Sequence, residues 1–304
     1  MSEPQRPLGS VIIPAYYSAS TIPGCLDSLR KQTWRFFEVI MINSSPESQT
    51  ESLVLGSYPE VRFEQHPKRL LPHEARNRGA ALARSDLLVF TDPDCNADPD
   101  WLERLVSAIG EDCQALVGAM ELGGDSLWEQ AVHLIKFHWL LGGLDPGIKF
   151  CAPTANAAYT RRLWERIGPF PEGYYAADGI LSYRAAVAGH PPRFVPSAVV
   201  RHRHLDPAIS LFRQRFSRGR DYARAQLCAM GEPGLSAWLR LIFSWTALPL
   251  VLARAERDAF RCGWVRPYLL TLPVQAAGHG LWAIGESCGA LELLVRRLRP
   301  AGVK

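Results

Sequence analysis

The sequence predicts an α/β fold built on a mostly parallel central sheet. Apolar runs alternate with amphipathic stretches, which gives expected strands near residues 10–14, 37–42, 60–64, 86–90 and 114–120, with helices between them. Runs such as Leu87-Leu88-Val89-Phe90 are apolar on both faces, as in strands that helices cover on both sides. Parallel strands need such crossover helices, so the alternation favours right-handed strand–helix–strand units.

The composition is that of a folded protein with one large domain, or one domain and an appendage. The chain has 304 residues, 47% of them apolar and 21% charged, which excludes disorder for most of its length. The net charge of +4 comes without a basic stripe interleaved with aromatic residues, so we expect no nucleic acid partner. Seven cysteines without paired spacing indicate reduced thiols in the cytosol, and the polar start indicates no signal peptide.

Two carboxylates, Asp92 and Asp94, follow the strand expected at residues 86–90. Open α/β sheets bind ligands at the carboxyl ends of their strands. Two acids that face such a crevice repel each other unless a hard divalent cation joins them, so Mg²⁺ or Mn²⁺ between protein and phosphate is the natural partner. The alternative is an acidic turn that only leads into the next helix.

The sequence of the turn after the first strand excludes several classes of nucleotide-binding protein. A dinucleotide-binding dehydrogenase needs a glycine-rich turn there, and a P-loop protein needs a Gly-Lys-Ser/Thr loop. The sequence has Pro14-Ala15-Tyr16-Tyr17 at this turn, and neither motif occurs elsewhere. The turn also lacks the glycine-rich, arginine-containing loop expected of a nucleotidyltransferase.

In combination, these motifs resemble those of the inverting family 2 glycosyltransferases, which have a fold of the GT-A type. The resemblance covers residues 9 to about 222 and includes the helical segment Ala75–Ala83, the Asp92-Pro93-Asp94 motif and the stretch from Ile167 to Asp178. It implies the metal-dependent transfer of a sugar from a nucleoside diphosphate to a hydroxyl acceptor.

The resemblance also implies the domain organisation. We expect a GT-A domain over residues 1–230, with a nucleotide-binding half at about 8–120 and an acceptor half at about 121–230. A membrane-associating helical region is expected over residues 231–304.

Donor-binding residues are expected around the ends of the first two strands and on the helix before the acidic pair. Pro14 and Ala15 lead to Tyr16, whose ring would stack on a nucleobase, unless it is a half-buried tyrosine at a strand end. Asn43 stands where the family usually has an aspartate that contacts the base, and its amide can still accept a hydrogen bond. Arg76 is the candidate for a contact with the base or the diphosphate, the alternative being an exposed arginine on a helix.

Three side chains are candidates for the metal site. The resemblance implies that Asp94 binds the metal directly, and that Asp92 contacts the ribose or a metal-bound water. His202, at the end of a later strand, matches a family histidine that joins the metal or the diphosphate; the alternative is a surface polar residue.

Asp178 is the expected general base of the transfer. An inverting reaction needs one carboxylate to take the proton of the attacking hydroxyl. Ala177 replaces the first acidic residue of the family pair, but Asp178 is retained. Because Asp178 stands just before a helical run, a helix cap is its alternative role.

Further donor contacts are expected later in the chain. Asn156 lies in a small-residue segment, 151–159, that resembles the floor beneath the sugar, or else is a buried turn and strand. Arg215 and Arg218 would share one helix face and reach the diphosphate or an anionic membrane, or simply face solvent. Departures from the family pattern at Asn43, Ser48 and Ala177 leave one alternative open: a degenerate GT-A domain that binds nucleotide or a membrane partner without transfer.

Two apolar segments, 237–253 and 267–285, suggest contact with a membrane. Both are short for a bilayer-crossing helix, both contain proline, and the arginines between them oppose a crossing from the cytosol. We therefore expect interfacial or re-entrant helices on the cytoplasmic face, with a two-helix anchor and helices packed on the soluble domain as alternatives. The expected interfacial anchors are Trp238, Trp245, Trp264 and Trp282. Such attachment favours a lipid-linked acceptor and a role in cell-envelope glycan biosynthesis.

Overall fold

The computed structural model describes residues 7–205, 207–229 and 234–298. The chain divides into two compact units that interleave along the sequence. The sheet unit comprises Met1–Gly123, Asp145–Gly173 and Leu181–Arg203. The helical unit comprises Gly124–Leu144, Tyr174–Ile180 and His204–Lys304. The expected α/β class with a central sheet and flanking helices is confirmed.

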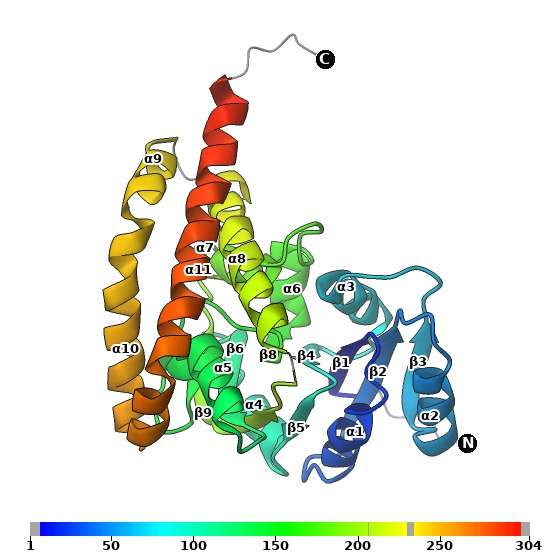
Figure 1. Ribbon diagram of the computed structural model, residues 1–304. Helices are drawn as coiled ribbons and strands as arrows, with labels where there is room; N and C mark the ends of the chain where they lie inside the picture. Colours follow the sequence, from blue (N-terminus) through cyan, green and yellow to red (C-terminus); the bar gives the residue numbers. More distant parts are fainter. Residues whose placement is uncertain (1–6, 206, 230–233, 299–304) are drawn as a thin grey trace, which may run out of the picture. The chain divides into compact units, whose positions relative to one another are not determined.

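The sheet unit is built on a mixed sheet, which has nine strands among the described residues (Figure 1). Their order is β3-β2-β1-β4-β8-β6-β9-β5, and β7 pairs with β9 outside this path. β1 is parallel to β2 and β4, β2 is parallel to β3, and β8 is antiparallel to both of its neighbours. The strands are β1 (Gly9–Ala15), β2 (Phe37–Asn43), β3 (Val61–Gln65), β4 (Leu87–Thr91), β5 (Cys95–Ala97), β6 (Ala115–Leu122), β7 (Gly147–Ile148), β8 (Asn156–Thr160) and β9 (Arg193–His202).

All five strands expected from the apolar runs are present, as β1, β2, β3, β4 and β6. The central residues of β1, β2, β4 and β6, such as Ile12, Ile40 and Val89, are fully buried because helices pack against the sheet, whereas β3 is only partly buried. The helices that pack on the strands are α1 (Ile22–Arg30), α2 (Gln49–Ser57), α3 (Pro72–Leu82), α4 (Trp101–Ala108) and α6 (Arg161–Ile167). The next helix, α7 (Ala177–Val187), begins in the helical unit and ends in the sheet unit. Thr21 immediately precedes α1, but its hydroxyl donates to the Ser18 carbonyl and does not cap the helix.

The strand register brings several strand ends to one edge of the sheet. Ala15 at the end of β1 pairs with Asn43 at the end of β2, and Ile12 pairs with Phe90 of β4. Asp92 therefore leaves the sheet beside the turn that follows β1. The edge predicted for ligand binding is thus formed by neighbouring parallel strands.

The helical unit is organised around a long helix, α11 (Val265–Leu298), with α8 (Ala208–Arg224) beside it (Figure 1). A Cβ atom added at Gly219, Gly285 or Gly289 would lie 2.0–2.3 Å from a backbone oxygen of the facing helix. Glycine at these positions therefore lets the two backbones approach closely. The remaining elements are α5 (Leu127–Phe137), η1 (His138–Leu140), η2 (Ala225–Ala229, a π-helix), α9 (Gly234–Phe243), η3 (Ser244–Thr246) and α10 (Ala247–Arg261).

The two apolar segments expected at a membrane fall in the helices α9 to α11. The first is divided among α9, η3 and α10, and the second lies inside α11, which contains Pro273. Among the described helices, we find none that combines the length and the apolar character needed to cross a bilayer.

Candidate active site

Four potential metal ligands gather at the edge where β4 ends. Asp92, Asp94, Cys95 and His202 each place one ligand atom within 4.8 Å of the others. Both carboxylates are partly exposed, whereas the thiol and the imidazole are buried. The expected candidates Asp92, Asp94 and His202 are therefore brought together, and Cys95 is an addition that directly follows the Asp-x-Asp motif.

His202 reaches the acidic pair because β5 pairs with β9. In this antiparallel ladder Cys95 lies opposite His202, and the backbone NH of Arg203 donates to the Asp94 carbonyl at 3.2 Å. His202 Nε2 lies 3.7 Å from Asp94 Oδ1. The last residue of β9 is thereby fixed beside the loop that follows β4.

Arg76 on α3 forms a largely buried ion pair with Asp92. The Arg76 guanidinium is 4% exposed at the side chain, against 25% for Asp92, and its Nη1 also lies 3.5 Å from His73 Nδ1. The alternative of an exposed helix arginine is therefore wrong. Arg76 fixes one carboxylate and offsets part of the negative charge of the pair.

The cluster suits a hard divalent cation. Carboxylate oxygens and one imidazole are ligands that Mn²⁺ accepts. Donors on opposite sides of one small ion lie about 4 Å apart, and the ligand atoms here lie within 4.8 Å of one another, so one ion could bridge them. Burial, and then the charges of Asp94 and Asp92, hold the pKa of the Cys95 thiol well above its usual range. Thiolate sulfur suits softer metals than Mg²⁺ or Mn²⁺, so Cys95 is the poorest ligand of the four. The residues that would hold the ion are Asp92, Asp94 and His202.

Tyr16 lies at the carboxyl end of β1, beyond the buried residues Pro14 and Ala15. Its ring is 37% exposed, and the Arg69 guanidinium lies over it at 4.7 Å from the centroid. A flat ring with an arginine beside it suits a nucleobase and its phosphates. Arg69 was missed from sequence because it lies in the loop between β3 and α3, outside any motif.

Asn43 is placed at the expected strand end but has no exposed surface. Its Nδ2 donates to Gln65 Oε1 at 2.7 Å, and its Oδ1 accepts from the Ser45 hydroxyl at 2.9 Å. The Ser45 hydroxyl in turn accepts at 2.6 Å from the NH of Tyr17, whose φ of 51° is unusual for a residue other than glycine. The expected direct contact between Asn43 and a base is therefore corrected: Asn43 orders the turn around Tyr17, and Gln65 is the exposed member of this network.

Asn156 is also fully buried. Its Oδ1 accepts from Trp101 Nε1 at 2.8 Å, and its Nδ2 donates to the carbonyls of Ala119 and Ala198 at 2.8 and 2.9 Å. These bonds join α4 and the central strands, and they use both polar atoms of the amide. The expected sugar contact is corrected to a structural role, in line with the buried turn and strand.

Asp178 lies in the first turn of α7 and is partly exposed. Its Oδ1 accepts a hydrogen bond from the NH of Gly179 at 2.9 Å. The segment before it is held within the helical unit by Asp221 of α8, whose Oδ2 accepts from the NH groups of Tyr175 and Ala176 at 2.5 and 3.2 Å. Asp221 was not apparent from the sequence, because only the fold brings α8 to this turn.

Arg215 and Arg218 do not share one solvent-facing surface as expected. Arg215 is buried, stacks on the Trp282 ring at 4.4 Å and donates to the Gly278 carbonyl at 3.4 Å, whereas Arg218 is exposed. Burial, and then the charge of Arg218, lower the pKa of Arg215 to about 9. The expected diphosphate contact of Arg215 is therefore corrected to a packing contact between α8 and α11.

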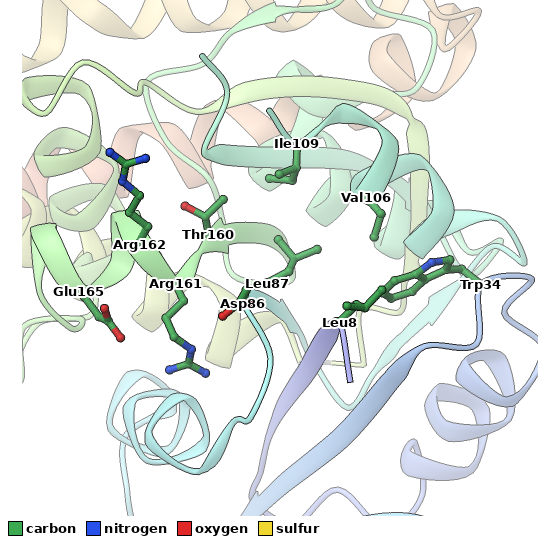
Figure 2. A pocket seen from close by; sticks show the side chains of 10 residues that line it. All are labelled: Leu8, Trp34, Asp86, Leu87, Val106, Ile109, Thr160, Arg161, Arg162 and Glu165. Atoms are coloured by element: carbon green, nitrogen blue, oxygen red, sulfur yellow. The ribbon is translucent and has the colours of Figure 1, made fainter. Parts of the chain in front are cut away.

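A separate pocket of about 550 Å³ lies at the opposite end of the strands (Figure 2). Leu87, the first residue of β4, lines this pocket. Asp92 lies at the other end of the strand, directly after its last residue. None of the candidate site residues lines it. The lining residues are Leu8, Trp34, Asp86, Leu87, Val106, Ile109, Thr160, Arg161, Arg162 and Glu165.

Solved structures of similar fold include two glycosyltransferases. One is the mannosyltransferase PcManGT from Pyrobaculum calidifontis in complex with GDP-Man and Mn²⁺, with a TM-score of 0.61 and 22% identity over 97% of this chain and 88% of that chain. The other is S. aureus TarS in complex with UDP-GlcNAc, with a TM-score of 0.52 and 15% identity over 93% of this chain and 92% of that chain. At these identities the similarity establishes the GT-A fold.

Sequence relatives are also glycosyltransferases. Glycosyltransferase AglE of Haloferax volcanii is 26% identical over 70% of this chain and 72% of its own length. The O-antigen chain rhamnosyltransferase RfbN of Salmonella typhimurium is 27% identical over 69% of this chain and 71% of its own length. The model of the family described as glycosyl transferase family 2 matches residues 10–168. The protein is thus a glycosyltransferase and belongs to glycosyl transferase family 2.

Proposed function

We propose that this glycosyltransferase moves a sugar from a nucleoside diphosphate carrier to a hydroxyl acceptor, with inversion at the anomeric carbon. The observation that carries the proposal is the convergence of Asp92, Asp94 and His202 at the carboxyl edge of the sheet. This edge also holds Tyr16 and its stacked Arg69. Two structural neighbours were solved with GDP-Man and UDP-GlcNAc, which supports a nucleotide sugar as the donor.

A divalent cation, Mg²⁺ or Mn²⁺, is part of this proposal. Asp92, Asp94 and His202 would hold it, and Mn²⁺ in the PcManGT complex supports the assignment. When bound, the ion neutralises charge on the donor diphosphate. Arg76 orients Asp92 through their ion pair, and Tyr16 and Arg69 receive the nucleotide.

Asp178 is proposed as the general base. The acceptor oxygen forms a bond to the anomeric carbon, the bond from that carbon to the diphosphate breaks, and the hydroxyl proton passes to the Asp178 carboxylate. The hydrogen bond from the NH of Gly179 orients the Asp178 carboxylate, and the Asp221 anchor limits movement of the preceding segment. Asp221 is a positioning residue in this scheme.

A lipid-linked acceptor on the cytoplasmic face of a membrane completes the proposal. Its support is the large apolar side chains exposed on α9 to α11, such as Trp238, Leu250 and Leu269, and the O-antigen function named for RfbN is consistent with cell-envelope glycan synthesis.

Donor binding tests the metal assignment directly. UDP, GDP and dTDP sugars are each added with and without Mn²⁺, and the melting temperature is measured, because a ligand bound by the folded state raises it. We expect one nucleotide class to stabilise wild type only with Mn²⁺, and Asp94→Asn to lose this effect. Asp100→Asn is the matched control, because it removes an acid that pairs with Arg104 four residues later and lies outside the cluster of candidate metal ligands. Equal stabilisation of wild type after chelation would refute the metal assignment.

Measurement of donor hydrolysis and sugar transfer tests whether Asp178 is the general base. We expect Asp178→Asn to retain metal-dependent donor binding and to lose donor hydrolysis and transfer by about 10²- to 10⁴-fold. Unchanged turnover in Asp178→Asn would exclude Asp178 as the base. Tight nucleotide binding by wild type without turnover of any donor would instead favour the degenerate domain.

A further inference from the structure

The helices α9 and α10 and the 3-10 turn between them carry large apolar side chains on their outer surface. Trp238, Phe243, Trp245 and Leu250 are each about half exposed, at 49, 52, 47 and 60%. They lie close together in the sequence and belong to consecutive elements on one side of α11 (Figure 1). Clustered exposed aromatic residues mark an interaction surface.

This outer surface is not needed for packing within the helical unit. On α9 the inner residues Ala237 and Leu241 pack with Ala290 and Leu294 of α11. On α10 the inner residue Ala255 belongs to a separate buried cluster. Each helix therefore has an inner apolar face that is already covered, and the exposed aromatic residues are additional.

Arginines continue the same surface along α10. Leu250, Arg254, Arg257 and Arg261 follow one another at intervals of four, three and four residues, so they form one stripe on the helix. Arg257 bonds to Asp258 at 2.8 Å, yet its side chain is 59% exposed. The acids of α10 are Glu256 and the buried Asp258, so positive charge predominates along this helix.

We propose that this aromatic and arginine surface, made of α9, η3 and α10, docks the enzyme on a bilayer that contains anionic lipid. Trp and Phe side chains enter the interfacial layer, while the arginine stripe contacts the phosphates of the lipid headgroups. A second copy of the chain is a poorer occupant, because a two-fold contact would bring the same arginines towards one another. The inference deepens the proposed membrane location of the enzyme and rests on that proposal for its biological role. The docking itself is tested without turnover.

Vesicle flotation of the full chain tests the surface. The wild type is mixed with vesicles of phosphatidylcholine alone, or of phosphatidylcholine with phosphatidylglycerol. We expect stronger binding to the anionic vesicles. Phe243→Ser should weaken binding to both kinds of vesicle at least tenfold, because it removes one aromatic side chain that docking would bury in the bilayer interface. Arg254→Gln with Arg261→Gln should weaken binding only to the anionic vesicles, by about fivefold for each arginine.

Matched controls come from the sheet unit. Phe36 is 52% exposed, the same as Phe243, so Phe36→Ser removes an equally exposed ring from another surface. Arg162→Gln removes an exposed arginine there. Both controls should bind vesicles as the wild type does.

Three results would overturn the docking. The first is no vesicle binding by the wild type, and the second is an equal loss of vesicle binding in Phe36→Ser and Phe243→Ser. The third is a wild type that forms a dimer and does not bind vesicles, where Phe243→Ser dissociates the dimer. Each leaves metal-dependent donor binding untouched, so failure of the docking is distinguishable from failure of the proposed transfer.

Discussion

The close contact between α8 and α11 makes a strong prediction about one methyl group. Gly285→Ala places a Cβ atom 2.0 Å from the Phe216 carbonyl oxygen, whereas real Cβ atoms stay at least 3.0 Å from such atoms. Because this oxygen belongs to the backbone, it cannot rotate away from the added methyl group. The two helices therefore have to separate by about 1 Å along a contact that Gly219 and Gly289 also form.

Two opposing terms set the magnitude of this change. Overpacking costs about 1–3 kcal/mol, and the upper end applies because no side chain can yield. Alanine gains about 1 kcal/mol over glycine in a helix interior. We therefore expect Gly285→Ala to lower the free energy of unfolding by about 2 kcal/mol.

Gly280→Ala is the matched control in the same helix. A Cβ atom at Gly280 has no neighbour within 4 Å, so only the gain in helix propensity remains. We expect this variant to gain up to about 1 kcal/mol.

Thermal unfolding followed by circular dichroism measures both variants. With about 2–4 °C per kcal/mol, Gly285→Ala should melt about 4–8 °C below wild type, and Gly280→Ala slightly above it. If the helical unit unfolds in a separate transition, the shift belongs to that transition. Equal melting temperatures of the two variants would show that α8 and α11 do not pack as closely as described.

Three further predictions concern single side chains. Burial, followed by the charges of Arg215 and His138, lowers the pKa of His279 to about 3. The folded state therefore keeps His279 neutral, so stability falls as the pH drops from about 6.5 towards 3, by up to about 1.4 kcal/mol per pH unit. In urea unfolding at several pH values, His279→Gln should remove this slope, and a slope unchanged from wild type would contradict the assignment. Asn156→Ala should cost about 2–4 kcal/mol in the same assay, because it leaves buried partners unsatisfied; a loss below about 1 kcal/mol would contradict its structural role. Asp221→Asn should lower kcat while donor KM stays constant, because it loosens the segment before Asp178, and a change in donor KM alone would argue against this role.

The sequence predicted the part of the site that depends on local pattern. The apolar run of β4 indicated a buried strand, and the next two acids had to emerge at its carboxyl end. The helix carrying Arg76 was also predicted, because its pattern is continuous over several turns.

The residues that were misassigned depend on contacts between distant segments. Asn43 and Asn156 look like exposed polar residues in the sequence, but Gln65 and Trp101 bury their amides in hydrogen bonds. Arg215 has the sequence pattern of a solvent-facing helix residue, but the Trp282 ring of α11 lies against its guanidinium. Burial of a polar side chain is set by its partners, and local pattern carries no information about them.

The ladder that sets Cys95 opposite His202 joins the first half of the chain to a strand formed much later. During synthesis on the ribosome, Asp92 and Asp94 are added to the chain long before His202. Closing so large a loop is slow, so the cluster of Asp92, Asp94 and His202 should be among the last features of the sheet unit to form. Under the proposed metal assignment, uptake of Mn²⁺ during refolding would report the completion of this unit.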